Sequence, residues 1–472
     1  MIRGVKSSAL SEIRTLLQRT ADIASDFLDS LDARPVFPTS SATELREALG
    51  GALPDGPTDP RSVLEDLAAA ADPGIVAMPS GRYFGFVIGG GLPAALAADW
   101  LTSTWDQNAC LYVCGPAASV VEQVVREWVC DLLGLPEDAS LGLVTGTQMG
   151  SVTALAAARF RVLERSGWDV ARDGLAGGPR TRVIVGAQRH VTIDRAVRLL
   201  GLGAPEVVPA DDQGRMEPTD LRDTLREGDG PTIVCAQAGE VNTGAFDPFD
   251  EIADAAAEHG AWLHVDGAFG LWAAASPRLR HLVQGVERAD SWITDAHKWL
   301  NVPYDSALVL CADPEAHRAA MTVSASYLIQ DDTRAERDQI DWVPESSRRA
   351  RGFAVYAALR SLGRSGLAEL VERTCECAQR FAEGIAELEG VEVLNEVVLN
   401  QVLFRFDTDE RTDRVLRAVQ EAGEVWMSGT TWGGRRAIRL SVSNWQTTDE
   451  EIDLALEAFR KASQLPAHAP AR

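Results

Sequence analysis

The chain has 472 residues, enough for one large domain with a smaller one or for two to three ordinary domains. Hydrophobic residues make up 46% of the chain and charged residues 24%, which is the balance of a globular protein with a substantial core. The formal net charge of -24 argues against nucleic acid or an anionic membrane surface as a partner, because both are themselves negatively charged.

Residues 1–80 are predicted to form a helical arm. Apolar residues recur at spacings of three and four over about residues 7–31, which predicts a helix, and Pro35 and Pro38 end it. A Pro/Gly-rich connector then leads to a short helix over about residues 63–70. This front section is too small for a core of its own.

The sequence also predicts where the protein works. The N-terminal residues mix charges into the apolar positions and lack the hydrophobic block of a signal peptide, and no apolar run approaches the length that spans a bilayer. The seven cysteines form no paired CxxC motifs of the kind that bind zinc, so we expect no metal site. An odd number of mostly buried thiols favours the reducing cytoplasm over disulfide pairing.

From residue 81 to residue 345 the pattern predicts a large domain of alternating strands and helices. The apolar runs lack polar alternation, as in strands that are buried on both faces, and repeated βαβ units predict a mostly parallel sheet. The predicted strands are LGLVT (141–145), TRVIV (181–185), TIVCAQ (232–237), WLHV (262–265), SWIT (291–294) and ALVLC (307–311).

Residues 346–462 are predicted to form a smaller α/β domain, with strands at QVLFRF (401–406) and RAIRLSV (436–442). Residues 463–472 are expected to be a disordered tail. The predicted fold is therefore α/β, with a helical arm in front and a small domain at the C-terminal end.

Charged side chains follow two of the predicted strands. Asp266 comes directly after WLHV, and Lys298 comes shortly after SWIT. In an open parallel sheet, ligands bind beyond the carboxyl ends of the strands, so both side chains are expected at one crevice. They could form a structural ion pair, or the lysine could be neutral or covalently bonded to a ligand.

Two further segments belong to the same edge. TGTQMGS (145–151) joins a strand to a helix, so its amides and Gln148 suit a phosphate, although an ordinary glycine-containing turn has the same pattern. His190 opens a helix after another strand, where it could equally be a cap or a core residue. Together these groups match pyridoxal phosphate, whose aldehyde bonds to a lysine and whose ring nitrogen pairs with a carboxylate.

The segments HVDGAFG and DSWITDAHKWLNVPYD resemble the pyridoxal-phosphate-dependent group II amino acid decarboxylases, which include the aromatic amino acid, histidine and glutamate decarboxylases. The resemblance extends from about residue 81 to about residue 444. It implies the fold type I architecture of the aspartate aminotransferase superfamily, with a seven-stranded-type sheet. It also implies pyridoxal 5'-phosphate as cofactor and an amino acid as substrate.

The resemblance implies a role for each matching residue. Lys298 would form the Schiff base, Asp266 would pair with the ring nitrogen, and His190 would stack over the ring near the substrate carboxylate. The remaining cofactor contacts would be Ala268 on the other ring face, Thr147, Gln148 and His297 at the phosphate, and Asn242 near the ring hydroxyl. The active site would lie at a homodimer interface embraced by the arm, and the substrate pocket would be lined by Tyr83, Phe84 and Trp105.

Two departures from the family pattern bear on the reaction. The phosphate turn has Gln148, Gly150 and Ser151 where the family usually has a small hydroxyl residue and Ala-Asn. Aromatic amino acid decarboxylases also carry a tyrosine on a mobile loop, which protonates the substrate carbon after carbon dioxide leaves. The matching segment, residues 330–342, contains no tyrosine, and Tyr327 is the one nearby.

The sequence therefore predicts decarboxylation of an L-amino acid, with an aromatic one plausible, to the amine. If no other acid replaces the loop tyrosine, oxidation to an aldehyde is the alternative. Transamination and aldol-type cleavage use the same cofactor, and a non-catalytic binding protein is the remaining alternative. Arg439 could bind a substrate carboxylate or form a surface or interdomain salt bridge.

Overall fold

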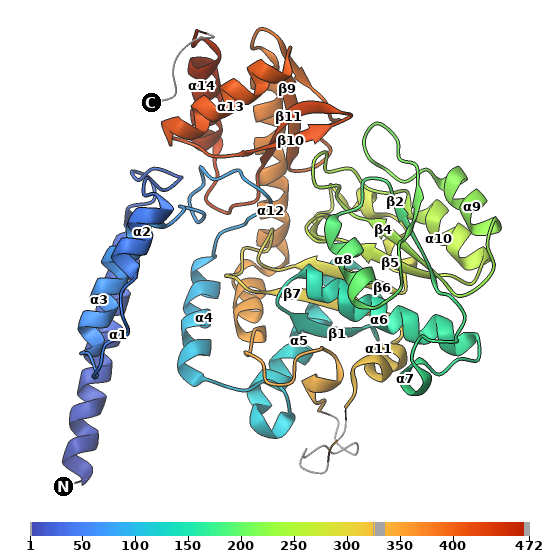
Figure 1. The fold of residues 1–472 in the computed structure, drawn as a ribbon, viewed down its shortest axis with the longest axis horizontal. Coiled ribbons are helices and arrows are strands. Elements are labelled where there is room, and N and C mark those ends of the chain that lie inside the picture. The colour runs from blue at the N-terminus through green and yellow to red at the C-terminus, as the bar shows by residue number, and fades with distance from the viewer. Residues whose placement is uncertain (1, 324, 326–335, 467–472) are drawn as a thin grey trace.

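The computed structural model describes residues 2–323, 325 and 336–466. Its centre is a seven-stranded sheet with the order β1-β7-β6-β5-β4-β2-β3 (Figure 1). Strand β7 runs antiparallel to β1 and β6, and the other four pairs are parallel, so the predicted mostly parallel sheet is confirmed. The strands are β1 Ser140–Val144, β2 Arg182–Gly186, β3 Glu206–Val208, β4 Thr232–Gln237, β5 Trp262–Asp266, β6 Ser291–Asp295 and β7 Ala307–Cys311.

Helices lie on both faces of this sheet (Figure 1), which is why its central strands do not alternate between buried and exposed positions. All five residues of each of β1, β5, β6 and β7 are buried. The large domain contains the helices α5 Pro116–Leu133, α6 Thr147–Arg165, α7 Val170–Asp173, α8 Val191–Leu199, α9 Pro218–Arg226, α10 Phe249–Glu258 and α11 Pro314–Met321. Short 3-10 helices occur at Asp72–Gly74, Tyr112–Cys114, Gly270–Ala275, Arg280–Val283, Val286–Arg288 and Gln339–Asp341.

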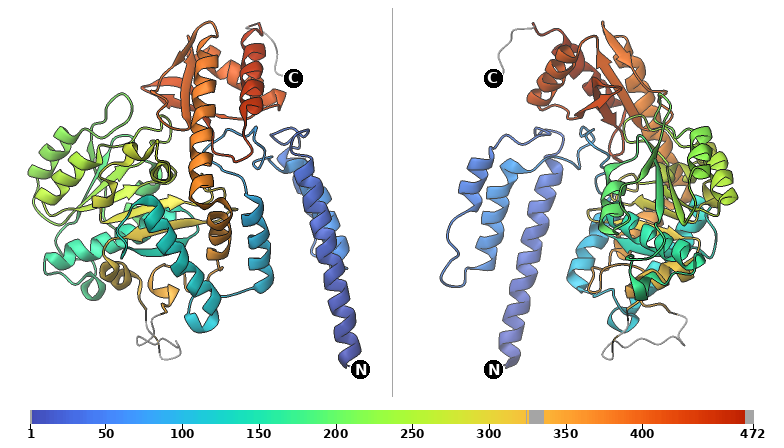
Figure 2. Two further views of the ribbon diagram at one scale, coloured as in Figure 1. Left: turned by 180° about the vertical axis from the view of Figure 1, so that it is seen from behind. Right: turned by 45° about the vertical axis from the view of Figure 1, so that its right-hand side comes forward.

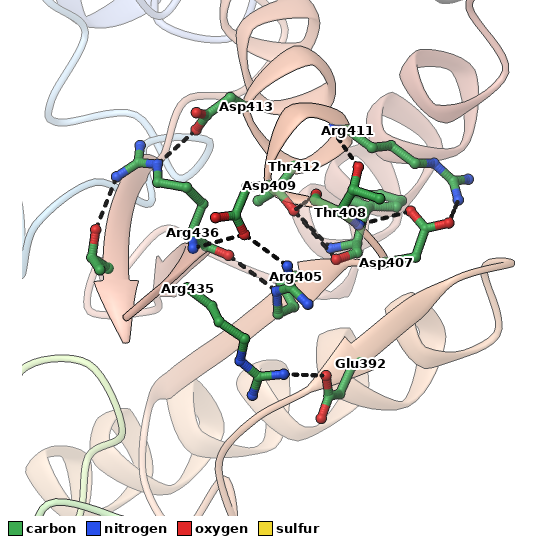
Figure 3. Close-up of polar contacts among 12 residues, drawn as sticks. Glu392, Arg405, Asp407, Thr408, Asp409, Arg411, Thr412, Asp413, Arg435 and Arg436 are labelled. Carbon is green, nitrogen blue, oxygen red and sulfur yellow. Dashed lines mark hydrogen bonds and ion pairs between the residues drawn. The ribbon is translucent and has the colours of Figure 1, made fainter. Parts of the chain in front are cut away.

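A second sheet of four antiparallel strands, with the order β10-β11-β9-β8, forms the small domain. It contains β8 Val391–Val393, β9 Gln401–Phe406, β10 Ser428–Trp432, β11 Arg435–Ser441, α13 Asp409–Ala422 and α14 Asp449–Ser463. It contains several arginine–carboxylate pairs, including the buried Arg405 with Asp409 at 2.8 Å and the partly exposed Arg436 with Asp413 at 2.9 Å (Figure 3).

One helix belongs to both domains. Helix α12 (Gly352–Ala386) is bent at Gly363, whose φ of 60° favours glycine. Residues of α12 up to Cys375 pack in the core of the large sheet, whereas Cys377 and the residues after it pack in the core of the small domain. Figure 1 shows α12 running from one domain into the other.

The front of the chain, referred to below as the arm, contains the helices α1 Ile2–Asp29, α2 Ala42–Leu49 and α3 Pro60–Ala71. Both views of Figure 2 show these helices standing beside the rest of the molecule. Their connection is fixed to the body where Arg82 donates to the carbonyls of Leu31 and Arg34, and where Phe37 stacks on Trp426. The arm and α4 (Pro93–Trp105) leave large apolar side chains exposed, namely Ile13, Leu17, Leu28, Leu49, Val63, Leu67, Trp100, Leu101 and Trp105.

A groove of about 1130 Å³ lies between the arm and the body, and it is lined by residues of both, including Trp100 and Tyr304. Within the described residues, no helix has the length and apolar character needed to cross a membrane. Residues 330–335 of the loop without tyrosine lie outside the described residues, as do Tyr327 and residues 467–472 of the predicted tail.

Candidate active site

Lys298 lies in the turn after β6, at the carboxyl edge of the large sheet. Its Nζ is 2.8 Å from Oδ2 of Asp295, and the lysine side chain is 21% exposed. Lys298 is therefore paired with a carboxylate, but the partner is Asp295 instead of the predicted Asp266.

The backbone around Lys298 is held from two sides. Asn301, in the left-handed region with φ 56°, donates from Nδ2 to the carbonyls of Trp299 at 2.8 Å and Ser443 at 2.9 Å. Gly89 passes so close that a Cβ there would lie 1.7 Å from the Lys298 carbonyl oxygen, so this position requires glycine. Both contacts fix where the lysine side chain begins.

Asp266 ends the neighbouring strand β5 and is 5% exposed. Its Oδ1 accepts from the amide of Ala268 at 3.1 Å, and the Ala268 carbonyl accepts from the amide of Asp295 at 2.8 Å. Burial raises the pKa of Asp266, and the nearby His190 and Lys298 oppose that rise. The structure thus brings Asp266, Ala268 and Lys298 to one edge, as the sequence predicts.

His190 is the N-cap residue of α8, at the end of β2. Its Nδ1 lies 2.8 Å from Oγ1 of Thr192 and accepts from the Thr192 amide at 3.4 Å, so the neutral ring carries its proton on Nε2. Burial lowers the pKa of His190, while Asp266 acts in the opposite direction. His190 therefore caps a helix and also lies near Asp266 and Lys298. The cap and the site residue considered from the sequence are the same side chain in two roles.

The predicted phosphate turn begins α6. The Thr147 amide donates to Oδ1 of Asp295 at 2.8 Å, and the Thr147 hydroxyl donates to Oδ2 at 2.9 Å. Gln148 donates from Nε2 to the Thr192 carbonyl at 3.2 Å, and its buried Oε1 has no hydrogen-bond partner. His297 stacks on Tyr304 with ring centroids 4.3 Å apart, and burial lowers the pKa of the His297 ring.

Two more predicted residues connect the site to the small domain. The side chain of Asn242 donates from Nδ2 to Oε1 of Glu240 at 2.8 Å. Its Oδ1 accepts from Oγ1 of Thr430, on β10, at 3.0 Å. Arg439, on β11, is buried and donates from Nη1 to the Val241 carbonyl at 2.7 Å. Arg439 has no carboxylate within ion-pair distance in the described part of the chain, so the salt bridge considered from the sequence is not observed.

The three predicted pocket residues lie in different places. Tyr83 is buried and stacks on Trp426 with centroids 5.2 Å apart, and burial raises its pKa to about 12 although Arg439 acts to lower it. Phe84 is fully buried in the core of the small domain, so the prediction that it lines a pocket is wrong. Trp105 is 49% exposed on α4 and packs edge-on against Phe353, away from this crevice in a single chain.

Sequence reasoning missed Asp295, which contacts Thr147, His297 and Lys298, and it missed Tyr304, which stacks on His297. A signal for Asp295 was present: it is an acidic residue at the end of a predicted strand, three positions before the lysine. On the fold, that spacing places the carboxylate within reach of the lysine amine.

A model of the pyridoxal-dependent decarboxylase conserved domain matches residues 43–407 of the chain. The aromatic-L-amino-acid decarboxylase of Bacillus atrophaeus is 27% identical over 93% of this chain and 93% of its own. The phenylacetaldehyde synthase of Petunia hybrida is 26% identical over 93% of this chain and 92% of its own. A solved structure of Oryza sativa TDC with PLP and tryptamine superposes with a TM-score of 0.90 at 25% identity, covering 96% of this chain and 98% of that one.

Proposed function

Because the chain belongs to the pyridoxal-dependent decarboxylase family, we propose that it removes the α-carboxyl group of an L-amino acid as carbon dioxide and releases the amine. Its cofactor is pyridoxal 5'-phosphate, and the enzyme is of the carboxy-lyase class. The observation that carries the proposal is that His190, Asp266 and Lys298 follow three strands at the carboxyl edge of the large sheet, near enough for their charges to act on one another.

The residues at the crevice fit this cofactor. Lys298 offers a partly exposed primary amine for the aldehyde, and the buried Asp266 carboxylate would gain a cationic partner in the protonated ring nitrogen. When bound, the cofactor ring accepts the electron pair of the bond that breaks.

The other residues are assigned to binding and orientation. Thr147, Gln148 and His297 would hold the phosphate, Ala268 would contact the ring face, and Asn242 would lie near the ring hydroxyl. The neutral His190 ring carries a proton on Nε2 that can be donated to the substrate carboxylate. The buried guanidinium of Arg439 supports a role for Arg439 as a second carboxylate contact.

A second candidate reaction is decarboxylation coupled to oxygen, which gives the aldehyde. In that reaction the amino acid, oxygen and water give aldehyde, carbon dioxide, ammonia and hydrogen peroxide. The absence of tyrosine from residues 330–342 favours it, and one of the relatives is named as an aldehyde synthase. The two reactions share carbon dioxide and differ in every other product.

We expect the cofactor-loaded protein, incubated in air with a panel of amino acids led by aromatic ones, to release carbon dioxide and amine in equal amounts. Carbon dioxide, amine, aldehyde, peroxide and keto acid are measured together. Aldehyde matched by peroxide would replace the first candidate by the second. Turnover without carbon dioxide would contradict both.

We also propose a homodimer, acting in the cytoplasm, with residues 1–80 as the arm that embraces the partner. The exposed apolar side chains of the arm and of α4 support it, as does the groove between arm and body. Because Tyr304 lines that groove and stacks on His297, its occupant would reach the active site. Light scattering is expected to give twice the chain mass, and deletion of residues 1–80 to give an inactive monomer. A fully active monomer would contradict this assembly.

A further inference from the structure

The side chain of Asp295 connects the two ends of the site. It is 2% exposed, and its two oxygens accept from the amide and the hydroxyl of Thr147 at 2.8 Å and 2.9 Å. The same carboxylate lies 2.8 Å from Nζ of Lys298 and 3.4 Å from Nε2 of His297. One buried anion is thus bonded both to the first residue of α6 and to the lysine.

These contacts are the ones that a phosphate at the start of α6 would use. A helix N-terminus binds anions through its first amides, and here the first amide and its hydroxyl already point at a carboxylate. A second anion at this position meets a like charge in a site of low dielectric, where repulsion is stronger than in water. Asp295 and the cofactor phosphate therefore compete for the same donors.

We propose that Asp295 is a positioning residue that occupies the anion site at the start of α6 until cofactor arrives, and that anion binding there is accompanied by uptake of one proton on Asp295. The inference rests on the proposed function, because it takes the phosphate position from it. It adds a specific role for Asp295, which the assigned cofactor contacts do not include.

The surrounding charges give the direction of the proton linkage. The groups that face Asp295 are Lys298 and His297 on its own segment, His190 at the start of α8, Asp266 at the end of β5, and Tyr304. Burial acts to raise the pKa of Asp295, but Lys298, His297 and the Thr147 amide outweigh it, so the carboxyl pKa lies below its usual range.

An anion beside the carboxylate reverses that balance, because burial and the added negative charge both favour the protonated acid. The pKa of Asp295 then rises on binding. Between the lower pKa of the free protein and the higher pKa of the bound one, each pH unit of increase is expected to weaken anion binding about tenfold. Above the higher value the affinity no longer changes with pH.

Sulfate tests this without chemistry at Lys298, because its charge does not change between about pH 5 and about pH 8 and it has no aldehyde. Sulfate is titrated calorimetrically into the cofactor-stripped chain, for the wild type and for Asp295→Asn. The variant is expected to bind sulfate at least about tenfold more tightly near pH 8, with a smaller dependence on pH. Equal affinity and equal slope, or weaker binding by the variant, would overturn the proposal.

Asp290→Asn is the matched control. Asp290 directly precedes β6, at the opposite end from Asp295, and it accepts from the Leu263 amide at 2.7 Å. The same chemical change is thus made at the other edge of the sheet, and sulfate binding is expected to stay at the wild-type level. A tenfold gain in Asp290→Asn would show that lost negative charge anywhere in the domain is enough, which overturns the role of Asp295.

A measurement on the wild type alone covers the case that Asp295→Asn does not fold. Repeating the titration below neutral pH in buffers of different ionisation enthalpy counts the protons taken up, and a value near one per sulfate is expected. A value of zero overturns the proposal. Pyridoxal phosphate bound at Lys298, seen by its absorbance and by borohydride trapping, tests the proposed function separately. A chain that traps the cofactor but binds sulfate without a proton retains its function and loses only this inference.

Discussion

Replacing Lys298 by alanine is expected to lower carbon dioxide release by about ten-thousand-fold or more, since alanine offers no amine to the cofactor aldehyde. The variant is also expected to lose the covalent adduct that borohydride fixes on the wild-type chain. The measurements are the initial rate of carbon dioxide release and the mass of the reduced protein. The assigned Asp266 and His190 remain in place, so weak non-covalent cofactor binding is compatible with this result.

Lys461→Ala is the control for this experiment. Lys461 lies on α14 and is 61% exposed, so the same side-chain deletion is made far from the crevice. Its rate and adduct are expected to match the wild type. If Lys298→Ala retained full activity, or if the reduced adduct appeared unchanged on it, the assignment of the cofactor lysine would be wrong.

Arg348→Ala is expected to lower the free energy of unfolding by about 3–5 kcal/mol, because it leaves a buried carboxylate without its main partner. Arg348 is fully buried and bonds Oε1 of Glu122 at 2.7 Å, where Glu122 is 1% exposed. It also donates to the carbonyls of Ala109 at 2.9 Å and Leu143 at 2.6 Å, so the substitution frees backbone acceptors as well. Denaturant unfolding of the cofactor-loaded protein measures the loss.

The adjacent residue provides the comparison. Arg349 pairs with Asp99 at 2.7 Å, but both side chains are partly exposed, so Arg349→Ala is expected to lower the free energy of unfolding by about 1 kcal/mol or less. The two variants remove the same side chain at neighbouring positions and differ in burial. A similar loss for both would mean that burial of the Glu122 pair does not determine its contribution.

Much of the fold followed from apolar runs. Strands β4, β7 and β9 have the predicted bounds, and the predicted fold type I architecture is confirmed by the similarity to the rice structure. The strands that were missed are β3 and β8, of three residues each, and the polar β10. Such segments have too few apolar residues to be recognised alone, because their pairing partners, which are distant in sequence, determine their conformation.

The site was predicted in part for a similar reason. Lys298, Asp266 and His190 follow predicted strands, so their common edge could be inferred from topology. The partners of Asp295 could not be inferred in this way. Thr147 lies 148 residues away in the sequence, and the contact between Thr147 and Asp295 depends on how α6 packs against β6. Phe84 was placed wrongly because an aromatic residue in a sequence gives no sign of whether it faces a pocket or a core.

Most surface positive charge in this protein is carried by guanidinium groups, such as those of Arg435 and Arg436 in Figure 3. Of the 45 basic side chains, only three are lysines, at positions 6, 298 and 461. Primary amines condense with aldehydes, whereas guanidinium groups stay protonated at neutral pH and do not. An aldehyde that approaches this chain therefore meets few competing amines, and little of it is lost to unproductive adducts. The scarcity of lysine on the surface thus favours reaction of the aldehyde with Lys298, in addition to any selectivity from the shape of the site.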